Sequence, residues 1–193
     1  NKCKTLDEVK ALPLGNGTVQ DAVTDRSGIT GEKMELDGYN VVEGAYTSIY
    51  NHQGNNQLCT IVAMNKEAEA AAHGVAMQIA ALNTPYLTEA DVPTDVIEHE
   101  KEVMRQQVIN EGKPEAIADK IVMGKIGKFY KENCLVDQEF VKDNKQTIKQ
   151  YTNNTAKALG GSIEIAKFVR FEKGEGIEKR QDDFAAEVAS MVK

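Results

Sequence analysis

The N-terminal part of the chain shows two short helical patterns separated by a turn. Residues 5–8, Thr-Leu-Asp-Glu, form a capping box, in which the threonine and the glutamate satisfy free N–H groups of a first helical turn. Residues 15–17, Gly-Asn-Gly, interrupt the pattern, and Thr18 can cap a second helix through its hydroxyl. The helical pattern ends around Gly28 and Gly31. We therefore expect two short helices here.

Three runs with strand character follow, at residues 34–42, 45–52 and 58–64. Apolar and polar side chains mix along them, and neither side of the second run is purely apolar. The second and third runs are separated by Gln-Gly-Asn-Asn at residues 53–56. A polar loop that contains glycine favours an antiparallel hairpin.

The middle of the chain has helical periodicity. Residues 67–82 place alanines and larger apolar residues at spacings of three and four. Residues 94–110 and 114–133 predict two longer helices joined by a short link, in which Gly112 suits the position after a helix and Pro114 the first helical position. We expect a protruding antiparallel helical hairpin, with its inner seam formed by Ile97, Met104 and Val108 against Ile117, Ile121, Val122, Phe129 and Tyr130.

The C-terminal part continues with a short helix within residues 144–161, a strand at 162–172 and a last helix from about residue 182. Strands and helices are segregated along the chain rather than strictly alternating. This order predicts an α+β fold, with antiparallel β-sheets packed against helices and the helical hairpin as an addition.

Composition narrows the class of protein. The chain has 193 residues, of which 41% are hydrophobic and 27% charged, a balance typical of a globular protein. Thirty acidic residues against 23 basic ones give a net charge of -7. Because binding to a phosphate backbone needs a basic face, we expect no direct contact with nucleic acid.

Cysteine usage and hydropathy indicate the compartment. The three cysteines, Cys3, Cys59 and Cys134, are widely spaced and form no C-x-x-C pair, which fits a reducing cytoplasm. No apolar run approaches the length of a membrane span. We expect a cytoplasmic protein without a membrane partner.

Known catalytic and metal-binding motifs do not match this chain. His99-Glu100 resembles the start of H-E-x-x-H, but Val103 stands where the second histidine is needed. Residues 174–176, Gly-Glu-Gly, fit no phosphate-binding loop, and no G-x-S-x-G is present. We expect no catalytic residue, no metal and no cofactor, so not an enzyme. His52, at the tip of the predicted hairpin, is the candidate for contact with a partner.

Several motifs together resemble elongation factor Ts. Residues 110–129 combine E-G-K-P-E with a helix that carries K-I-V-M-G-K. The similarity extends through residues 134–138, 140–143, 168–172, 174–179 and 183–188, and upstream through 31–33, 50–52 and 76–87. It covers nearly the whole chain, and the order of the motifs makes it specific.

The resemblance implies a guanine-nucleotide exchange factor for the GTPase elongation factor Tu in translation elongation, which promotes GDP release by protein–protein contact. The alternative, from another functional class, is a non-catalytic structural module that self-associates. The assembly that we consider for this alternative is a homodimer.

The resemblance also implies three contact regions. The turn of Ile29, Thr30, Gly31 and Glu32 matches a segment that packs on the GTPase domain; family members often have an apolar residue where this chain has Thr30. A second region faces the barrel domain farthest from the nucleotide, and a third docks on the GTPase domain. The second region matches His52 together with Phe140, Val141 and Lys142. The third matches the C-terminal helix, with Phe184 and Val188.

On the same resemblance, residues 1–44 are a remnant of the N-terminal core subdomain, and residues 45–91 with 134–181 form the C-terminal, dimerisation-type core subdomain. Residues 92–133 form the arm and residues 182–193 the C-terminal helix module. The family's N-terminal helical module and its T-D-F-V motif, which carries the main wedge, are absent from this sequence. We therefore expect a fragment that alone binds weakly and exchanges slowly.

Overall fold

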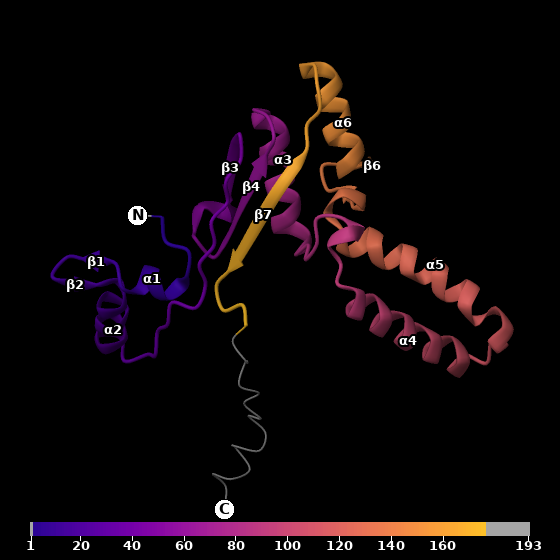
Figure 1. Ribbon diagram of the computed structural model, residues 1–193, viewed down its shortest axis with the longest axis horizontal. Coiled ribbons are helices and arrows are strands. Elements are labelled where there is room, and N and C mark those ends of the chain that lie inside the picture. Colours follow the sequence, from indigo (N-terminus) through magenta and orange to yellow (C-terminus); the bar gives the residue numbers. More distant parts are fainter. Residues whose placement is uncertain (1, 177–193) are drawn as a thin grey trace, which may run out of the picture. The chain divides into compact units, whose positions relative to one another are not determined.

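The computed structural model describes residues 2–176, and its contacts divide the chain into two compact units (Figure 1). Unit 1 comprises Asn1–Val41, and unit 2 begins at Val42. The predicted last helix from about residue 182, with Phe184 and Val188, lies outside the described residues. Helices and antiparallel sheets confirm the predicted α+β fold class.

Unit 1 contains the two predicted helices, α1 (Leu6–Lys10) and α2 (Val19–Thr30), and a small antiparallel hairpin of β1 (Pro13–Leu14) and β2 (Gly17–Thr18) that was not predicted. Both predicted caps are present. Thr5 accepts from the N–H of Glu8, and Thr18 forms a reciprocal capping box with Asp21. These hydrogen bonds from Thr18 lower the pKa of the Asp21 carboxyl. No residue in the described part of this unit is fully buried, so local capping defines it more than a core does.

The predicted strand at residues 34–42 is wrong, because this segment has no regular secondary structure. It contains Asp37, Gly38 and Asn40, residues that are depleted in strands because they favour turns. It also pairs with no strand of the sheet, whose order is β3-β4-β7. The phenolic O–H of Tyr39 donates instead to the carbonyl oxygen of Cys3, at 2.9 Å, within the same unit.

The body of unit 2 is a three-stranded antiparallel sheet of β3 (Tyr46–Asn51), β4 (Leu58–Met64) and β7 (Ile165–Glu172). The predicted hairpin of the second and third runs is confirmed as β3–β4, in which Tyr50 lies opposite Thr60. β7 pairs on the other side of β4 and is the strand predicted at residues 162–172, with a later start.

One helix covers one face of this sheet. α3 (Glu69–Leu82) packs on β3 and β4, and the hydroxyl of Thr60 donates to the carbonyl oxygen of Ala76 at 2.9 Å. The predicted helix at residues 67–82 is therefore confirmed with a start two residues later. Its buried face and the facing strands form the core, which consists of Val62, Met64, Ala68, Ala71, Ala72, Val75, Ala76, Ile79, Leu135, Phe140, Ile148, Ala156 and Ile163.

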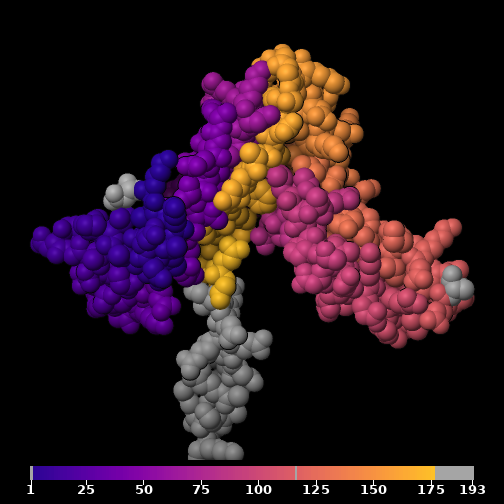
Figure 2. All heavy atoms as spheres, in the orientation of Figure 1, coloured from indigo at the N-terminus to yellow at the C-terminus, as the bar shows by residue number. Residues whose placement is uncertain are grey.

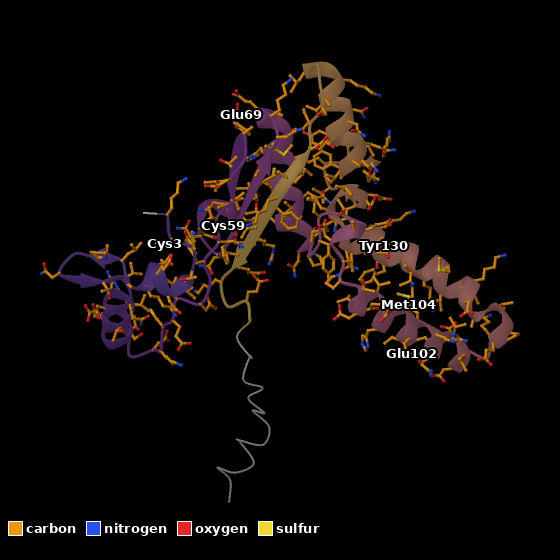
Figure 3. The ribbon with its side chains drawn as sticks, in the orientation of Figure 1. Cys3, Cys59, Glu69, Glu102, Met104 and Tyr130 are labelled. Carbon is orange, nitrogen blue, oxygen red and sulfur yellow. The ribbon has the colours of Figure 1, made fainter. Side chains whose placement is uncertain are left out.

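The predicted helical hairpin is confirmed as α4 (Thr94–Asn110) and α5 (Glu115–Asn133), which lie side by side in Figure 1. Gly112 has a φ of 76°, and the N–H of Lys113 donates to the carbonyl oxygen of Val108 at 3.2 Å. This pattern ends α4 as predicted. Figure 3 labels Met104 and Tyr130 on the two helices.

The predicted seam of the arm needs one correction. Ile117 is exposed. The predicted Val122 is buried, and Ala118 and Ile126, which were not predicted, are buried with it, one helical turn before and after it on a single face. The predicted positions Ile97, Met104, Ile121, Phe129 and Tyr130 are half-buried, and Val108 is fully buried. The helix thus turns a slightly different face to its neighbour than the larger apolar residues suggest.

The link from the arm back to the sheet contains a second small hairpin, which was not predicted. The 3-10 helix η3 (Leu135–Asp137) leads into β5 (Glu139–Phe140) and β6 (Asp143–Thr147), joined by Val141 and Lys142 as a two-residue turn. α6 (Ile148–Leu159) follows with a capping box of Thr147 and Gln150, inside the range predicted for a short helix. The remaining 3-10 helices are η1 (His52–Gly54) and η2 (Glu89–Asp91).

Gly74 provides a test of this packing. A Cβ atom at this position would lie 3.1 Å from the Tyr151 hydroxyl oxygen and 3.2 Å from Phe140 Cζ, two rings that stack with centroids 4.3 Å apart. We expect Gly74→Ala to lower the free energy of unfolding by roughly 1 kcal/mol or more, measured by urea denaturation, because overpacking outweighs the gain in helix propensity.

The matched control is Gly124→Ala in α5, where a Cβ atom would meet nothing within 4 Å. That variant should gain about 0.5–1 kcal/mol, since alanine is the better helix former. Equal stabilisation by both substitutions would contradict the close packing at Gly74.

Candidate functional site

The first predicted contact region is the turn that ends α2. Gly31 has a φ of 72° and its N–H donates to the carbonyl oxygen of Ser27 at 2.9 Å, which closes the helix. The hydroxyl of Thr30 reaches the carbonyl oxygen of Arg26 at 3.0 Å and accepts from the N–H of Glu32 at 3.3 Å. Ile29 is 73% exposed. The turn thus exposes an apolar side chain, while hydrogen bonds within the turn and to the end of α2 fix its backbone.

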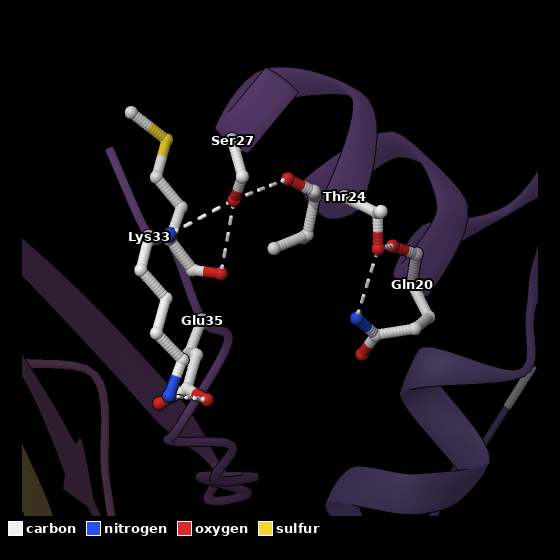
Figure 4. Close-up of polar contacts among 7 residues, drawn as sticks. Gln20, Thr24, Ser27, Lys33 and Glu35 are labelled. Atoms are coloured by element: carbon white, nitrogen blue, oxygen red, sulfur yellow. Dashed lines mark hydrogen bonds and ion pairs between the residues drawn. The ribbon is translucent and has the colours of Figure 1, made fainter. Parts of the chain in front are cut away.

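Ser27 connects this turn to the segment that follows it (Figure 4). Its Oγ accepts from the N–H of Met34 at 2.9 Å and lies 3.2 Å from the Val23 carbonyl oxygen and 3.3 Å from that of Met34. Lys33 and Glu35 form an exposed ion pair at 2.8 Å. Their mutual hydrogen bond raises the pKa of Lys33 and lowers that of Glu35, so both groups are charged at neutral pH.

The second region begins at His52, which is exposed at the end of β3. The loop after it is held by asparagine side chains. Asn51 Oδ1 accepts from the N–H of Asn56 at 3.1 Å, and the two asparagine side chains also bond to each other. Gln53, Gly54 and Asn56 all have positive φ, which glycine and asparagine tolerate better than most residues. The glycine and asparagines of the loop therefore permit the backbone conformation that follows the exposed His52.

Tyr50 orients the His52 ring. Its hydroxyl oxygen lies 3.0 Å from His52 Nδ1, and its ring meets the edge of His73 on α3 with centroids 5.5 Å apart. Tyr50 is half-buried and packs against the core. His52 is thus joined through Tyr50 to α3 and does not project freely into solvent.

The turn between β5 and β6 contains the other predicted residues of this region. Phe140 is 4% exposed and stacks on Tyr151, whereas Val141 is 47% exposed and Lys142 is also exposed. Of the three predicted residues, Val141 and Lys142 are accessible to a partner, and Phe140 supports the turn from the core. The N–H of Val141 donates to Gln78 Oε1 on α3 at 2.8 Å.

Within unit 2, α3 connects the predicted contact residues. His73 meets Tyr50, the neighbour of His52, and Gly74 lies against Phe140, whose neighbour is Val141. The turn at residues 29–32 belongs to the other unit, and Phe184 and Val188 lie outside the described residues. The His52 and Val141 parts of the predicted site thus both connect to α3, through different residues of that helix.

Sequence reasoning missed Tyr50 and Gln78. For Gln78 a signal existed, because it is a polar residue on the apolar face of an alanine-rich helix, between Val75 and Ile79. Tyr50 lies in the segment 50–52 that resembles the family, but its contact with His73 gave no such signal, since a tyrosine in a strand is ordinary and His73 is 23 positions away in a separate element.

The described residues contain little that suggests bond chemistry. No three His, Cys, Asp or Glu side chains among residues 2–176 converge as metal ligands would. A cleft of about 510 Å³ lies beside the base of the arm, lined by Leu82, Lys128, Lys131, Asp137, Glu139 and Thr147 among others; lysines and carboxylates are mixed in it, so its charge selects no ionic ligand. No helix in this part of the chain is both long and apolar enough to cross a membrane.

Cys134 is the buried cysteine of the described chain. Burial raises the pKa of its thiol to about 11, and the carboxylates of Asp137, Glu89 and Asp91 add to the effect. A thiol is nucleophilic as the thiolate, so Cys134 is unreactive at neutral pH. It serves as a core residue beside Leu135.

Comparison with known proteins identifies relatives of this chain. The family model described as Elongation factor TS matches residues 1–175. The chain is 49% identical to an elongation factor Ts from Phocaeicola vulgatus, over 89% of this chain and 68% of that protein. It is 40% identical to one from Limosilactobacillus reuteri, over 100% of this chain and 65% of that protein.

A third relative, the elongation factor Ts of Clostridium perfringens strain SM101, is 43% identical over 97% of this chain and 64% of its own length. The chain therefore spans about two thirds of the length of these relatives. Since both the family model and the relatives cover most of the chain, it belongs to the elongation factor Ts family.

Proposed function

We propose that this chain is a guanine-nucleotide exchange factor that binds the GTPase elongation factor Tu in the cytoplasm and promotes release of GDP during translation elongation. Its place in the elongation factor Ts family carries the proposal. The exposed His52 and Val141, both supported by α3, are consistent with it.

Exchange of this kind requires no bond chemistry in the factor. The factor and GDP each lower the other's affinity for the GTPase by the same coupling free energy. Each tenfold weakening of GDP binding takes about 1.4 kcal/mol of contact energy made only in the nucleotide-free state. The factor needs a contact surface whose conformation stays fixed while the partner changes its own conformation. On this proposal the chain is not an enzyme in the usual sense and needs neither metal nor cofactor.

The contacts that we assign are Ile29, Thr30, Gly31 and Glu32 in unit 1, and His52, Val141 and Lys142 in unit 2, with Phe140 supporting the turn. Phe184 and Val188 remain assigned by resemblance. His52 offers an aromatic ring with a hydrogen-bonding edge, and Val141 offers an apolar side chain on a hairpin turn. Such rigid, partly apolar groups suit the anchor positions of a protein interface.

The first test is a titration of this chain against nucleotide-free elongation factor Tu and against the same GTPase saturated with GDP, by isothermal calorimetry. We expect tighter binding to the nucleotide-free form, because the coupling is reciprocal. GDP should correspondingly dissociate faster when the chain is added, which a fluorescent GDP analogue can follow. Equal affinity in both conditions would exclude an exchange role.

The second test addresses the assigned residues. We expect His52→Ala and Val141→Ala each to weaken the complex by about 1 kcal/mol, roughly fivefold in Kd, because each removes a supported contact group. Surface plasmon resonance can measure this change. The controls are His99→Ala and Val103→Ala, which remove exposed residues of the same types from α4.

The controls should bind like the native chain, and all four variants should melt near the native temperature. If a control weakened binding as much as its counterpart, the assigned surface would be wrong and the arm would be the better candidate.

A second candidate function is self-association, which one feature of the sheet favours. On the face opposite α3, Ile49, Ile61 and Val169 form a cross-strand row beside Cys59 and Phe171. Ile49 is 67% exposed and Phe171 45%. An apolar sheet face of this kind can pair with that of a second copy.

Light scattering on the chain alone tests this candidate. Self-association through the sheet predicts a mass that doubles with concentration and returns to that of a monomer in Ile49→Lys. Ile117→Lys on the arm, at another exposed isoleucine, is the control and should leave the dimer intact. A monomer at every concentration would reject the homodimer.

A further inference from the structure

The side chain of Gln78 bonds the backbone on both sides of Phe140. Gln78 is fully buried on α3. Its Nε2 donates to the carbonyl oxygen of Glu139 at 3.0 Å, and its Oε1 accepts from the N–H of Val141 at 2.8 Å. The amide thus pairs with this segment as a neighbouring strand would.

This pairing determines which side chain faces the core. Phe140 is the last residue of β5, and Val141 is the first residue of the turn that follows. With the groups on either side bonded to α3, Phe140 points inward onto Tyr151, and Val141 lies at the surface. A rotation of the segment would exchange the two and remove Val141 from the surface.

Gln138 extends the same network to the arm. Its Oε1 accepts from Gln78 Nε2 at 3.2 Å and from the Thr84 hydroxyl at 3.0 Å, while its Nε2 donates to the carbonyl oxygen of Glu132 at 2.8 Å. Glu132 is in the last turn of α5, where carbonyl groups lack partners within the helix. The two glutamines therefore hold the β5–β6 turn, α3 and the end of α5 together.

Stability alone gives a weak reason for an amide at position 78. An apolar residue would fill the same space without the cost of removing an amide from water. Glu139 and Val141 are exposed residues, and their hydrogen bonds to Gln78 are part-buried, so leaving these backbone groups unpaired costs less than it would at a fully buried position. What the buried amide adds is one defined conformation of the turn.

We propose that Gln78 is a positioning residue of the partner site, which acts by holding Val141 in the conformation that contacts elongation factor Tu. This inference rests on the proposed function. Gln78 is buried and touches no partner, so its effect on affinity is indirect and depends on the conformation of Val141.

The test is Gln78→Met, which keeps the length and helix propensity of the side chain and removes its hydrogen bonds. Gln138 Oε1 keeps Thr84 as a donor in this variant. We expect binding to elongation factor Tu to weaken about fivefold, as for loss of Val141 itself. Amide hydrogen exchange at Val141, followed by NMR, should accelerate at least tenfold, because Gln78 accepts its proton.

A double-mutant cycle separates positioning from general destabilisation. Val141→Ala should weaken binding in the native background but change it less than twofold in Gln78→Met. Thr60→Val is the matched control, since it removes a buried hydrogen bond to the same helix at Ala76. It should lower the melting temperature while affinity and Val141 exchange remain native.

Three results would overturn the inference. Native affinity in Gln78→Met would show that the turn needs no positioning, and an equal effect of Val141→Ala in both backgrounds would show that the two residues act independently. A loss of affinity in Thr60→Val equal to that in Gln78→Met would assign the effect to stability. If the native chain failed to bind elongation factor Tu, the proposed function itself would be wrong. There would then be no partner site for Gln78 to position.

Discussion

The close packing of α3 on the sheet is the constraint on which unit 2 depends. Ala71, Ala72, Gly74 and Ala76 are all buried along this helix, and their small side chains let its backbone come near its neighbours. The approach is close enough for Thr60 on β4 to bond a helix carbonyl and for the Phe140 ring to lie where Gly74 has no side chain. Larger residues on this face would separate the helix from the strands and from the β5–β6 hairpin at the same time, because one element contacts both.

This arrangement makes α3 the common support of the surfaces that we assign to partner binding. Its first half meets Tyr50, which holds His52, and its second half carries Gln78, which holds the Val141 turn. The exposed His52 and Val141 are therefore held in place by side chains that are half-buried or buried, Tyr50 and Gln78. On the proposed function, such support has a direct thermodynamic role, because side chains that are ordered before binding lose less entropy when the complex forms.

The arm and unit 1 follow different physical rules. The arm is a pair of helices with a narrow apolar seam. It is joined to the body where residues 86–87 and 133–136 exchange backbone hydrogen bonds and where Gln138 caps α5. Unit 1 has no fully buried residue among those described and relies on capping threonines and on Ser27. An exposed Ile29 on a turn with so little core beneath it is consistent with a segment that gains its remaining contacts from a partner.

The sequence by itself determined the local elements, because their signals are local. The capping threonines, the glycine after α4, the alanine-rich periodicity of α3 and the polar loop of the β3–β4 hairpin each act within a few residues. Through resemblance to a family, it also led to the prediction that His52 and Val141 are contact residues. Only the tertiary structure decided that residues 34–42 form no strand, that Ile117 faces outward and that Phe140 is buried while Val141 is not. Each of these depends on which partner lies opposite, and hydrogen bonds such as those of Gln78 join positions some sixty residues apart, a distance over which sequence periodicity carries no information.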